Sequence, residues 1–241
     1  MADVTTVEEG VVSDVVRLAA NKANKEIAEK HGGPSLLSSE LGNPVLNAFE
    51  ENVRLENEAR TDHLTGLRND RVLDEDLRSL QSRYDRSIIG GNGPLVGAIL
   101  AFDLTGLAKT NNSISHEAGD QYLQRAAETL KEVCRRGGDT PYRNGGQADE
   151  FTIVTQSAMT PEGIKTFFNE IDEILSGFQE KDRQKYPGIS YSLSKIAAIY
   201  GEGRNPVEAF HLAHNSMGEL KKEKQKETGQ RGLNVGSRIY R

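Results

Sequence analysis

The sequence predicts an α+β fold, in which an antiparallel βαββαβ sheet of the ferredoxin-like kind carries packed helices and follows N-terminal helices. Three features support this. A nearly continuous apolar run over residues 95–104 is typical of a central strand covered on both faces. Apolar residues recur at helical spacing before and after that run. Two glycines at 145–146 lie between two short strand-like segments, as in a hairpin.

Residues 1–60 differ in character from the rest and are predicted to be helical. Apolar residues recur at helical spacing over 12–27, and His31-Gly32-Gly33-Pro34 ends that helix. A second helix is expected to have Pro44 in its first turn. Its short apolar stripe comprises Leu46, Phe49 and Val53. The stripe either packs on the following domain or pairs with a second copy as a brief coiled coil. We expect a helical segment at 1–60, with possible dimerisation, and a domain at 61–241.

From Asp62 onward the predicted elements alternate in type. Helices are indicated by apolar spacing, strands by β-branched or continuous apolar runs, and loops by clustered Gly and Pro. In order, the prediction is helix 67–86, loop 88–94, strand 95–104, helix 116–136, strands 141–144 and 150–156, helix 161–177, strand 189–200 and helix 206–224.

The composition excludes several classes of protein. The 36 acidic and 30 basic residues give a net charge of −6, which argues against a general nucleic-acid binder. A single cysteine, Cys134, excludes an internal disulfide framework and a cysteine-rich zinc site. No apolar stretch approaches the roughly 20 residues needed to cross a bilayer, and the acidic N-terminus lacks a signal-peptide core. We therefore expect a cytoplasmic protein with no membrane span and no nucleic-acid partner.

The most informative stretch is Arg143–Phe151, with the sequence RNGGQADEF. The two glycines permit a tight turn with positive φ and a close approach of a ligand to the backbone. Asp149 and Glu150 then stand at the start of a strand, where paired carboxylates suit Mg²⁺ beside a nucleotide phosphate. Gly and Asp are also ordinary in a solvated turn, so the stretch alone leaves both interpretations open.

Four other polar residues are candidates for chemistry. Asp103 closes the apolar run and is either a cap for the next turn or a ligand presented by a rigid strand. Asn111 and Asp120 either cap the following helix or read a guanine edge, as an amide and a carboxylate together can. Lys221 lies near the end of the last helix, in a charge cluster that is either solvated or binds phosphate.

Three motifs, in order, resemble those of the GGDEF family, the diguanylate cyclases. Asp62-His63-Leu64-Thr65-Gly66-Leu67 is similar to the D-x-LTGL motif, and Asp103–Asp120 matches the nucleotide segment without a gap. Gly145–Phe151 resembles an expanded GGDEF signature. The resemblance covers about residues 60–235 and implies a polymerase-like palm that holds one GTP. Two such domains would face each other as a homodimer and form cyclic di-GMP, as in bacterial signal transduction.

The resemblance also implies which residues act in catalysis. Asp103 and Asp149 would bind Mg²⁺ (or Mn²⁺), together with the backbone carbonyl of Leu104. Glu150 would help to activate the 3′-hydroxyl of the ribose. Phosphoryl transfer needs little from a protein beyond positioning and charge neutralisation, and this donor set would supply both.

For substrate and product, the resemblance implies two further groups of residues. Asn111 and Asp120 would contact guanine, and Lys221 would bind phosphate. Arg136 and Asp139 form an R-x-x-D motif at the distance before the signature where the family binds its product as an inhibitor. A guanidinium can form a fork on phosphate or on guanine, although a surface ion pair is the alternative for this motif.

The chain departs from the family pattern at several positions. Gln147-Ala148 is inserted between the glycines and the acids, which preserves the facing of strand residues but lengthens the loop. Other departures are Thr105 for an acid, Leu107-Ala108 for Phe-Lys, Asn112 for Asp, Ser115 for Gly, Ser194–Ala197 in the S-x-G-x-A strand, His214–Gly218 for D-x-A-L-Y, and Gln225 for Arg. We therefore expect a cyclase of reduced activity. The alternative is a catalytically silent module that binds cyclic di-GMP through Arg136 and Asp139, or binds GTP.

Overall fold

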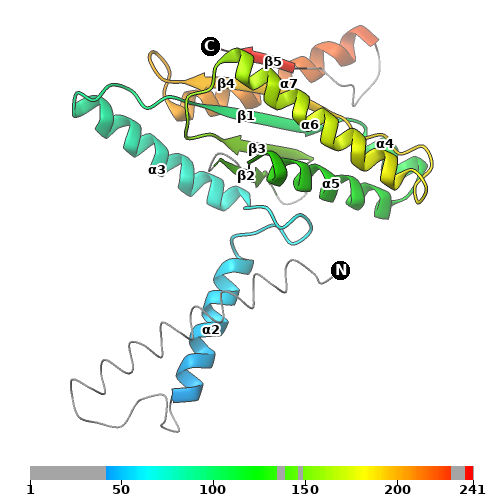
Figure 1. Cartoon of the computed structure of the whole chain (residues 1–241), viewed down its shortest axis with the longest axis horizontal. Coiled ribbons are helices and arrows are strands. Elements are labelled where there is room, and N and C mark those ends of the chain that lie inside the picture. Colours follow the sequence, from blue (N-terminus) through cyan, green and yellow to red (C-terminus); the bar gives the residue numbers. More distant parts are fainter. Residues whose placement is uncertain (1–41, 135–138, 146–148, 229–236, 241) are drawn as a thin grey trace. The chain divides into compact units, whose positions relative to one another are not determined.

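A five-stranded sheet forms the centre of the second of two units, Met1–Ala59 and Arg60–Arg241. The computed structural model describes residues 42–134, 139–145, 149–228 and 237–240. The strand order is β2-β3-β1-β4-β5 (Figure 1). The strands are β1 (Gly97–Leu104), β2 (Thr140–Arg143), β3 (Glu150–Val154), β4 (Leu193–Tyr200) and β5 (Ser237–Tyr240). All eight residues of β1 are buried, as expected for a strand covered on both faces.

The predicted antiparallel βαββαβ sheet is confirmed. Strand β1 pairs antiparallel with β3 and with β4, and β2 forms the hairpin with β3. Strand β5 adds a parallel edge strand beside β4, which the sequence did not indicate. Four residues are too short a run to show an alternation that distinguishes a strand from a loop.

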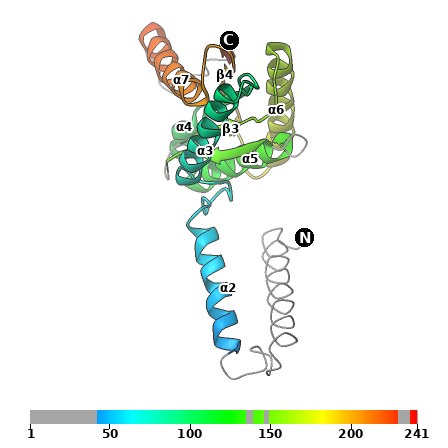
Figure 2. The same ribbon diagram turned by 90° about the vertical axis from the view of Figure 1, so that its left-hand side faces the viewer.

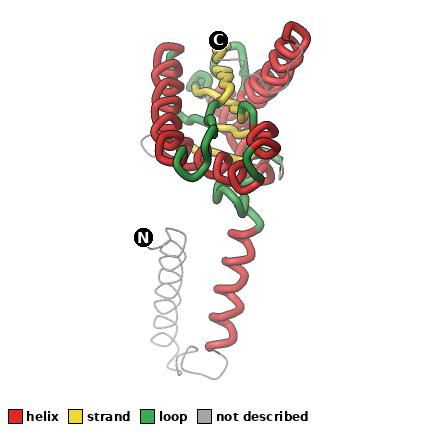
Figure 3. Tube along the Cα trace, turned by 90° about the vertical axis from the view of Figure 1, so that its right-hand side faces the viewer, coloured by secondary structure: helices red, strands yellow, loops and turns green. Residues whose placement is uncertain are grey.

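Helices cover both faces of the sheet. On one face lie α3 (Asp70–Ile89) and α7 (Pro206–Thr228), and on the other lie α5 (His116–Cys134) and α6 (Pro161–Asp182). Figures 2 and 3 show the strands between these helices, with α6 and α7 on opposite sides. Alternate residues of each strand therefore enter different cores: Phe102 faces α5 and α6, whereas Ala101 faces α3 and α7.

Several helix boundaries differ from the prediction, and one helix was not predicted. Helix α3 begins at Asp70 because Asn69 caps it, its side chain accepting a hydrogen bond from the Val72 N–H. Helix α6 continues through Gly177 to Asp182. The short helix α4 (Leu107–Ser113), which packs on α5, was not predicted, because seven residues span only two turns of apolar spacing.

Of the first unit the structure describes one helix, α2 (Gly42–Glu58), which corresponds to the second predicted helix. Arg54 forms ion pairs with Glu51 at 2.6 Å and with Glu58 at 2.8 Å along its exposed surface. Such pairs stabilise a helix by a few tenths of a kcal/mol each. The helix predicted over 12–27 lies outside the described residues.

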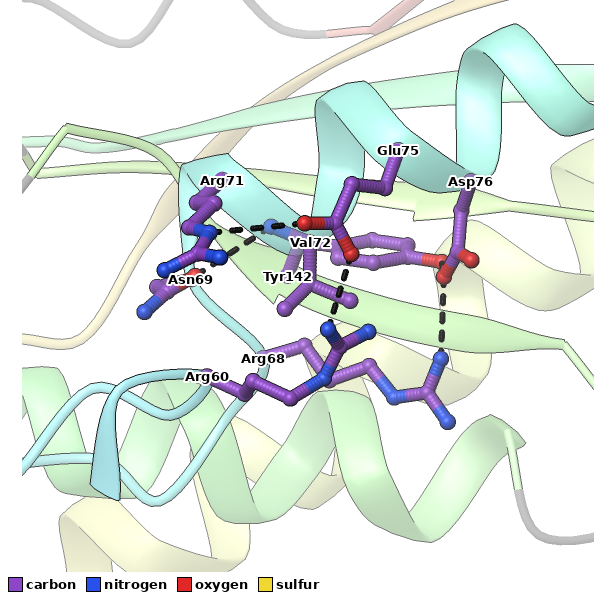
Figure 4. Close-up of polar contacts among 8 residues, drawn as sticks. All are labelled: Arg60, Arg68, Asn69, Arg71, Val72, Glu75, Asp76 and Tyr142. Carbon is purple, nitrogen blue, oxygen red and sulfur yellow. Dashed lines mark hydrogen bonds and ion pairs between the residues drawn. The ribbon is translucent and has the colours of Figure 1, made fainter. Parts of the chain in front are cut away.

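Charged contacts connect the turn before α3 with strand β2 (Figure 4). Asp76 of α3 accepts hydrogen bonds from Arg68 of the turn at 2.9 Å and from the Tyr142 hydroxyl of β2 at 2.7 Å. Arg60, at the start of the second unit, forms an ion pair with Glu75 at 2.8 Å. The turn, the helix and the strand thus share one polar network.

A buried ion pair makes the same connection deeper in the domain. Asp62 accepts hydrogen bonds from Arg143 at 2.8 Å and from the Thr65 N–H at 2.9 Å. Burial alone would raise the pKa of Asp62, but the hydrogen bonds from Thr65 and Arg143 bring it below its usual value. The D-x-LTGL turn is therefore held to the strand that leads into the signature hairpin.

Candidate functional site

Three of the predicted acids gather where β1 ends and β3 begins. Asp103 and Glu150 are direct partners in the antiparallel register of these strands. The next residue of β1, Leu104, donates its N–H to the Asp149 carbonyl at 3.0 Å. Asp103 follows Ala101 by two residues, so its side chain lies on the α3 and α7 face of the sheet.

Regular strand pairing continues up to the signature loop. Arg143 pairs with Phe151, and the Asn144 N–H donates to the Glu150 carbonyl at 3.0 Å. The inserted residues Gln147-Ala148 lie outside the described residues. Glu150 nevertheless stands opposite Asp103, because backbone hydrogen bonds on both neighbouring strands set its position.

Lys221 of α7 reaches the same carboxylates. Its ammonium pairs with Asp103 and lies 3.6 Å from Oε1 of Glu150. About one third of the Lys221 side chain is exposed, against 7 % of the Asp103 side chain. The neighbouring Lys222 is exposed. The structure therefore places Lys221 against the acids, where it balances part of their charge.

The electrostatics of the cluster suit a divalent cation. Burial raises the pKa of Asp103 to about 6; the Lys221 hydrogen bond opposes this rise, and the charges of Asp149 and Glu150 add to it. Three carboxylates and one ammonium carry a net charge of −2. Carboxylate oxygens are the donors that Mg²⁺ prefers. Within the described ranges, no three His, Cys, Asp or Glu side chains are grouped so that they could hold a metal ion by themselves.

The two predicted guanine contacts lie at the junction of α4 and α5. The Asn111 side chain packs so tightly on Gly119 that a Cβ added there would lie 1.7 Å from Asn111 Oδ1. Among the described residues, this buried oxygen has no hydrogen-bond partner. Asp120 follows Gly119 and is exposed. A buried acceptor without a partner costs free energy unless a ligand satisfies it.

On the expectation that Asn111 contacts guanine, replacing Gly119 with Ala should weaken GTP binding about ten-fold, the equivalent of one lost hydrogen bond. The methyl group would displace the Asn111 side chain, which is the flexible partner in the clash. The fold should survive, because Ala favours a helix over Gly by about 1 kcal/mol. Calorimetric titration with GTP measures the effect. Gly177→Ala is the control, since Gly177 also lies within a helix and a Cβ there would meet nothing within 4 Å. Equal GTP affinity in the two variants would refute the assignment of Asn111.

Asp139, the described residue of the predicted product-binding motif, lies away from the acids. The Asp139 carboxylate accepts from the Gln156 N–H at 3.3 Å, and the Gln156 side chain accepts from Arg83 of α3 at 3.2 Å. Burial raises the pKa of Asp139. Gln156 comes six positions after Glu150, just beyond the far end of β3, which corresponds to a span of roughly 20 Å at the rise of a strand. Arg136 lies outside the described residues.

Two residues that were not predicted as site residues also make contacts near the acids. His214 of α7 lies 3.9 Å from the Glu150 carboxylate. In the sequence, this residue stood out only as a departure from the D-x-A-L-Y pattern. The Tyr122 hydroxyl accepts from the Ser192 N–H at 2.6 Å and lies 3.2 Å from the Thr105 carbonyl. Tyr122 thereby connects the segment after β1 with the segment before β4, a contact for which the sequence has no local signal.

Comparison with known proteins bears on this site. The family model described as "Diguanylate cyclase, GGDEF domain" matches residues 59–227. An uncharacterized membrane protein of Staphylococcus saprophyticus is 36% identical over 181 residues, which cover 70% of this chain and 45% of that protein. An uncharacterized membrane protein of Staphylococcus epidermidis is 30% identical over 112 residues, covering 46% of this chain and 29% of that protein. The chain thus spans less than half the length of these relatives.

In the part of the chain that the structure describes, no helix is long and apolar enough to cross a membrane.

Solved structures share the fold. The coiled coil and GGDEF domain of DgcB from Caulobacter crescentus, in complex with c-di-GMP, is similar at a TM-score of 0.62 and 17% identity. The match covers 82% of this chain and 94% of the DgcB chain in that structure. Diguanylate cyclase SiaD from Pseudomonas aeruginosa, in complex with its activator SiaC, is similar at a TM-score of 0.55 and 19% identity. That match covers 99% of this chain and 85% of SiaD. At these identities the likeness shows the fold.

Proposed function

Because the chain belongs to the GGDEF (diguanylate cyclase) family, we propose that it condenses two GTP molecules into cyclic di-GMP and two diphosphates. The observation that supports this most is the pairing of Asp103 with Glu150 across β1 and β3, alongside a signature loop that is two residues longer. The Leu104–Asp149 backbone bond keeps the third acid beside them. The altered phosphate contacts suggest a reduced rate.

Mg²⁺ or Mn²⁺ would be held by Asp103, Asp149 and the carbonyl of Leu104. The net charge of −2 in the cluster and its oxygen donors fit such an ion. When bound, the ion would neutralise phosphate charge and stabilise the attacking and leaving oxygens.

The remaining steps belong to side chains of this chain. Glu150 takes the proton of the ribose 3′-hydroxyl. The oxygen of that hydroxyl attacks the α-phosphorus of the facing nucleotide, and the bond between this phosphorus and diphosphate breaks. Lys221 moves from Asp103 to the phosphates, which its partly exposed side chain allows. Asn111 offers its unpaired oxygen to the N–H groups of guanine, and Asp120 accepts beside it.

Two copies of the chain are needed, because each domain holds one of the two nucleotides. Pairing through residues 1–60 would raise the effective concentration of the second domain. We therefore propose a homodimer that acts in the cytoplasm, where GTP is available. The reaction product would bind through Arg136 and Asp139 and inhibit the enzyme.

Incubating the full chain with GTP and Mg²⁺ tests this function. Cyclic di-GMP should accumulate, and the rate per chain should rise with protein concentration until the dimer is saturated. Glu150→Gln should lower the rate by about 10²–10⁴-fold, the usual contribution of a general base. Absence of product at high protein concentration, with Mg²⁺ and with Mn²⁺, would refute a cyclase.

A binding module without catalysis is the second candidate. It is favoured by the separation of Asp139 from the acids, which allows product to bind without catalysis. Calorimetric titration of the full chain with cyclic di-GMP tests it, with Asp139→Asn expected to weaken binding. A wild-type chain that binds neither cyclic di-GMP nor GTP would exclude this role.

A further inference from the structure

One imidazole on α7 contacts strand β3, the residue that follows β2, and the acid that the signature hairpin carries. His214 Nε2 lies 3.0 Å from Oγ1 of Thr152 on β3, and 3.4 Å from Nδ2 of Asn144, which precedes the two glycines. On the other side of the ring, Nδ1 lies 3.9 Å from Oε2 of Glu150. His214 therefore connects the Glu150 carboxylate to the residues of the hairpin.

The proton of the neutral His214 ring faces Glu150 when it lies on Nδ1. In that tautomer Nε2 accepts from the Thr152 hydroxyl, and it faces the amide nitrogen of Asn144, which can only donate. The Asn144 amide also bonds the Thr152 hydroxyl, through Nδ2 at 2.9 Å and Oδ1 at 3.0 Å. If that hydroxyl donated to Asn144 Oδ1, Nε2 would carry the ring proton instead. Burial, together with the nearby charges of His211 and Lys221, lowers the pKa of His214 to about 4, so the ring is neutral near pH 7.

Helix α7 presents a second group to the same carboxylate. Lys221 is two turns beyond His214 and lies 3.6 Å from Oε1, so the two oxygens of Glu150 have different neighbours. The Phe210 ring packs on the imidazole with centroids 4.4 Å apart and restricts its rotation. A neutral donor can orient a carboxylate without cancelling the charge that a general base needs.

We propose that His214 is a positioning residue for Glu150, orienting the carboxylate through Nδ1–H and linking it through Thr152 and Asn144 to the lengthened hairpin. This inference rests on the proposed cyclase function. The GGDEF pattern usually has Asp at this position, so the imidazole contact belongs to this chain. Catalytic contacts are often long before substrate binds, and the 3.9 Å separation should shorten with nucleotide present.

Kinetics separate positioning from a purely structural role. His214→Phe keeps a ring against Phe210 but removes both nitrogens, and should lower kcat about ten-fold with KM for GTP unchanged. This loss is smaller than the ~10²-fold that a shift of 1 Å can cost. His214→Asn should retain most of kcat, because its amide nitrogen lies near the place of Nδ1. His211→Asn is the matched control, since His211 is exposed on the same helix and also packs on Phe210. A wild-type kcat in His214→Phe, or equal losses in both His214 variants, would overturn the proposal.

Nitrogen NMR of the full chain, with labelled histidine and without nucleotide, is independent of activity. We expect a protonated Nδ1 and an unprotonated Nε2 on His214. Glu150→Gln should shift the His214 Nδ1 resonance and leave His211 unchanged. A proton on Nε2, or no response to Glu150→Gln, would contradict the contact. If the wild-type chain makes no cyclic di-GMP, the proposed function fails, whereas this spectrum still decides whether His214 contacts Glu150.

Discussion

Replacing Asp103 with Asn should stabilise the nucleotide-free chain at neutral pH while abolishing the synthesis of cyclic di-GMP. Burial raises the pKa of Asp103 from 3.8 to about 6 against the opposing effect of Lys221, so the ionised group costs folding free energy at pH 7. A difference of about two pKa units corresponds to about 3 kcal/mol, which a neutral amide of the same shape avoids. The melting temperature should therefore rise by roughly 5–10 °C. Under the proposed function Asp103 is a ligand of the metal ion, so activity should be lost because a neutral amide cannot replace that carboxylate.

The stabilisation should depend on pH in a defined direction. The pKa of Asp103 is higher in the folded state, so its favourable contribution is present below pH 3.8 and is lost as the pH rises to about 6. Asp103→Asn and wild type should thus differ little near pH 4 and most above pH ~6. Added Mg²⁺ should stabilise wild type more than the variant.

Denaturant unfolding at several pH values measures both effects. Asp74→Asn serves as the control, because it makes the same change at an exposed acid on α3. If Asp103→Asn were less stable than wild type at pH ~7, the ion pair with Lys221 would outweigh burial, and the electrostatic account of the site would be wrong.

Replacing Asp62 with Asn should lower the free energy of unfolding by about 3–5 kcal/mol, the usual cost of breaking a buried ion pair from one side. Arg143 and Asp62 are only 5% and 6% exposed, and their 2.8 Å contact joins segments 81 residues apart in the chain. The variant leaves the Arg143 charge buried without the carboxylate that balances it. Cyclase activity should fall as well, since Arg143 ends the strand that leads into the signature hairpin.

An exposed pair of the same kind is the control for this loss. Arg183 and Glu180 lie 3.0 Å apart but are 55% and 63% exposed, so Glu180→Gln should cost less than about 1 kcal/mol. Combining Asp62→Asn with Arg143→Gln should cost less than the sum of the two single changes. Additive losses, or a loss for Asp62→Asn no larger than for Glu180→Gln, would show that the pair does not stabilise the domain.

The sequence predicted the elements whose signals are long or chemically distinct. The continuous apolar run of β1 and the glycine pair of the hairpin specify their elements locally, as does the apolar spacing of α5. Helix α4 and strand β5 were missed because seven and four residues carry too little periodicity. The extent of α6 was underestimated because Gly177 resembles a helix end, although the helix continues through it.

The resemblance to the GGDEF family pointed to a shared use of Asp103, Asn111 and Glu150, but the contacts among the site residues were not predictable from the sequence. The strand register accounts for Asp103 and Glu150 being neighbours. No local pattern indicated that Lys221 would pair with Asp103, or that His214 would lie beside Glu150. Both contacts depend on the rotation of α7 over the sheet, which long-range packing decides.

The most direct test of the account compares cyclic di-GMP formation by the full chain and by a variant that lacks Gln147-Ala148, at equal protein, GTP and Mg²⁺ concentrations. Since the register of β1 and β3, rather than the length of the loop, positions the acids, both proteins should make cyclic di-GMP. Their rates should agree within about ten-fold, well short of the ~10²-fold effect of a 1 Å displacement. If the shortened variant made product and the full chain made none, the inserted residues would abolish catalysis and the central claim would be wrong.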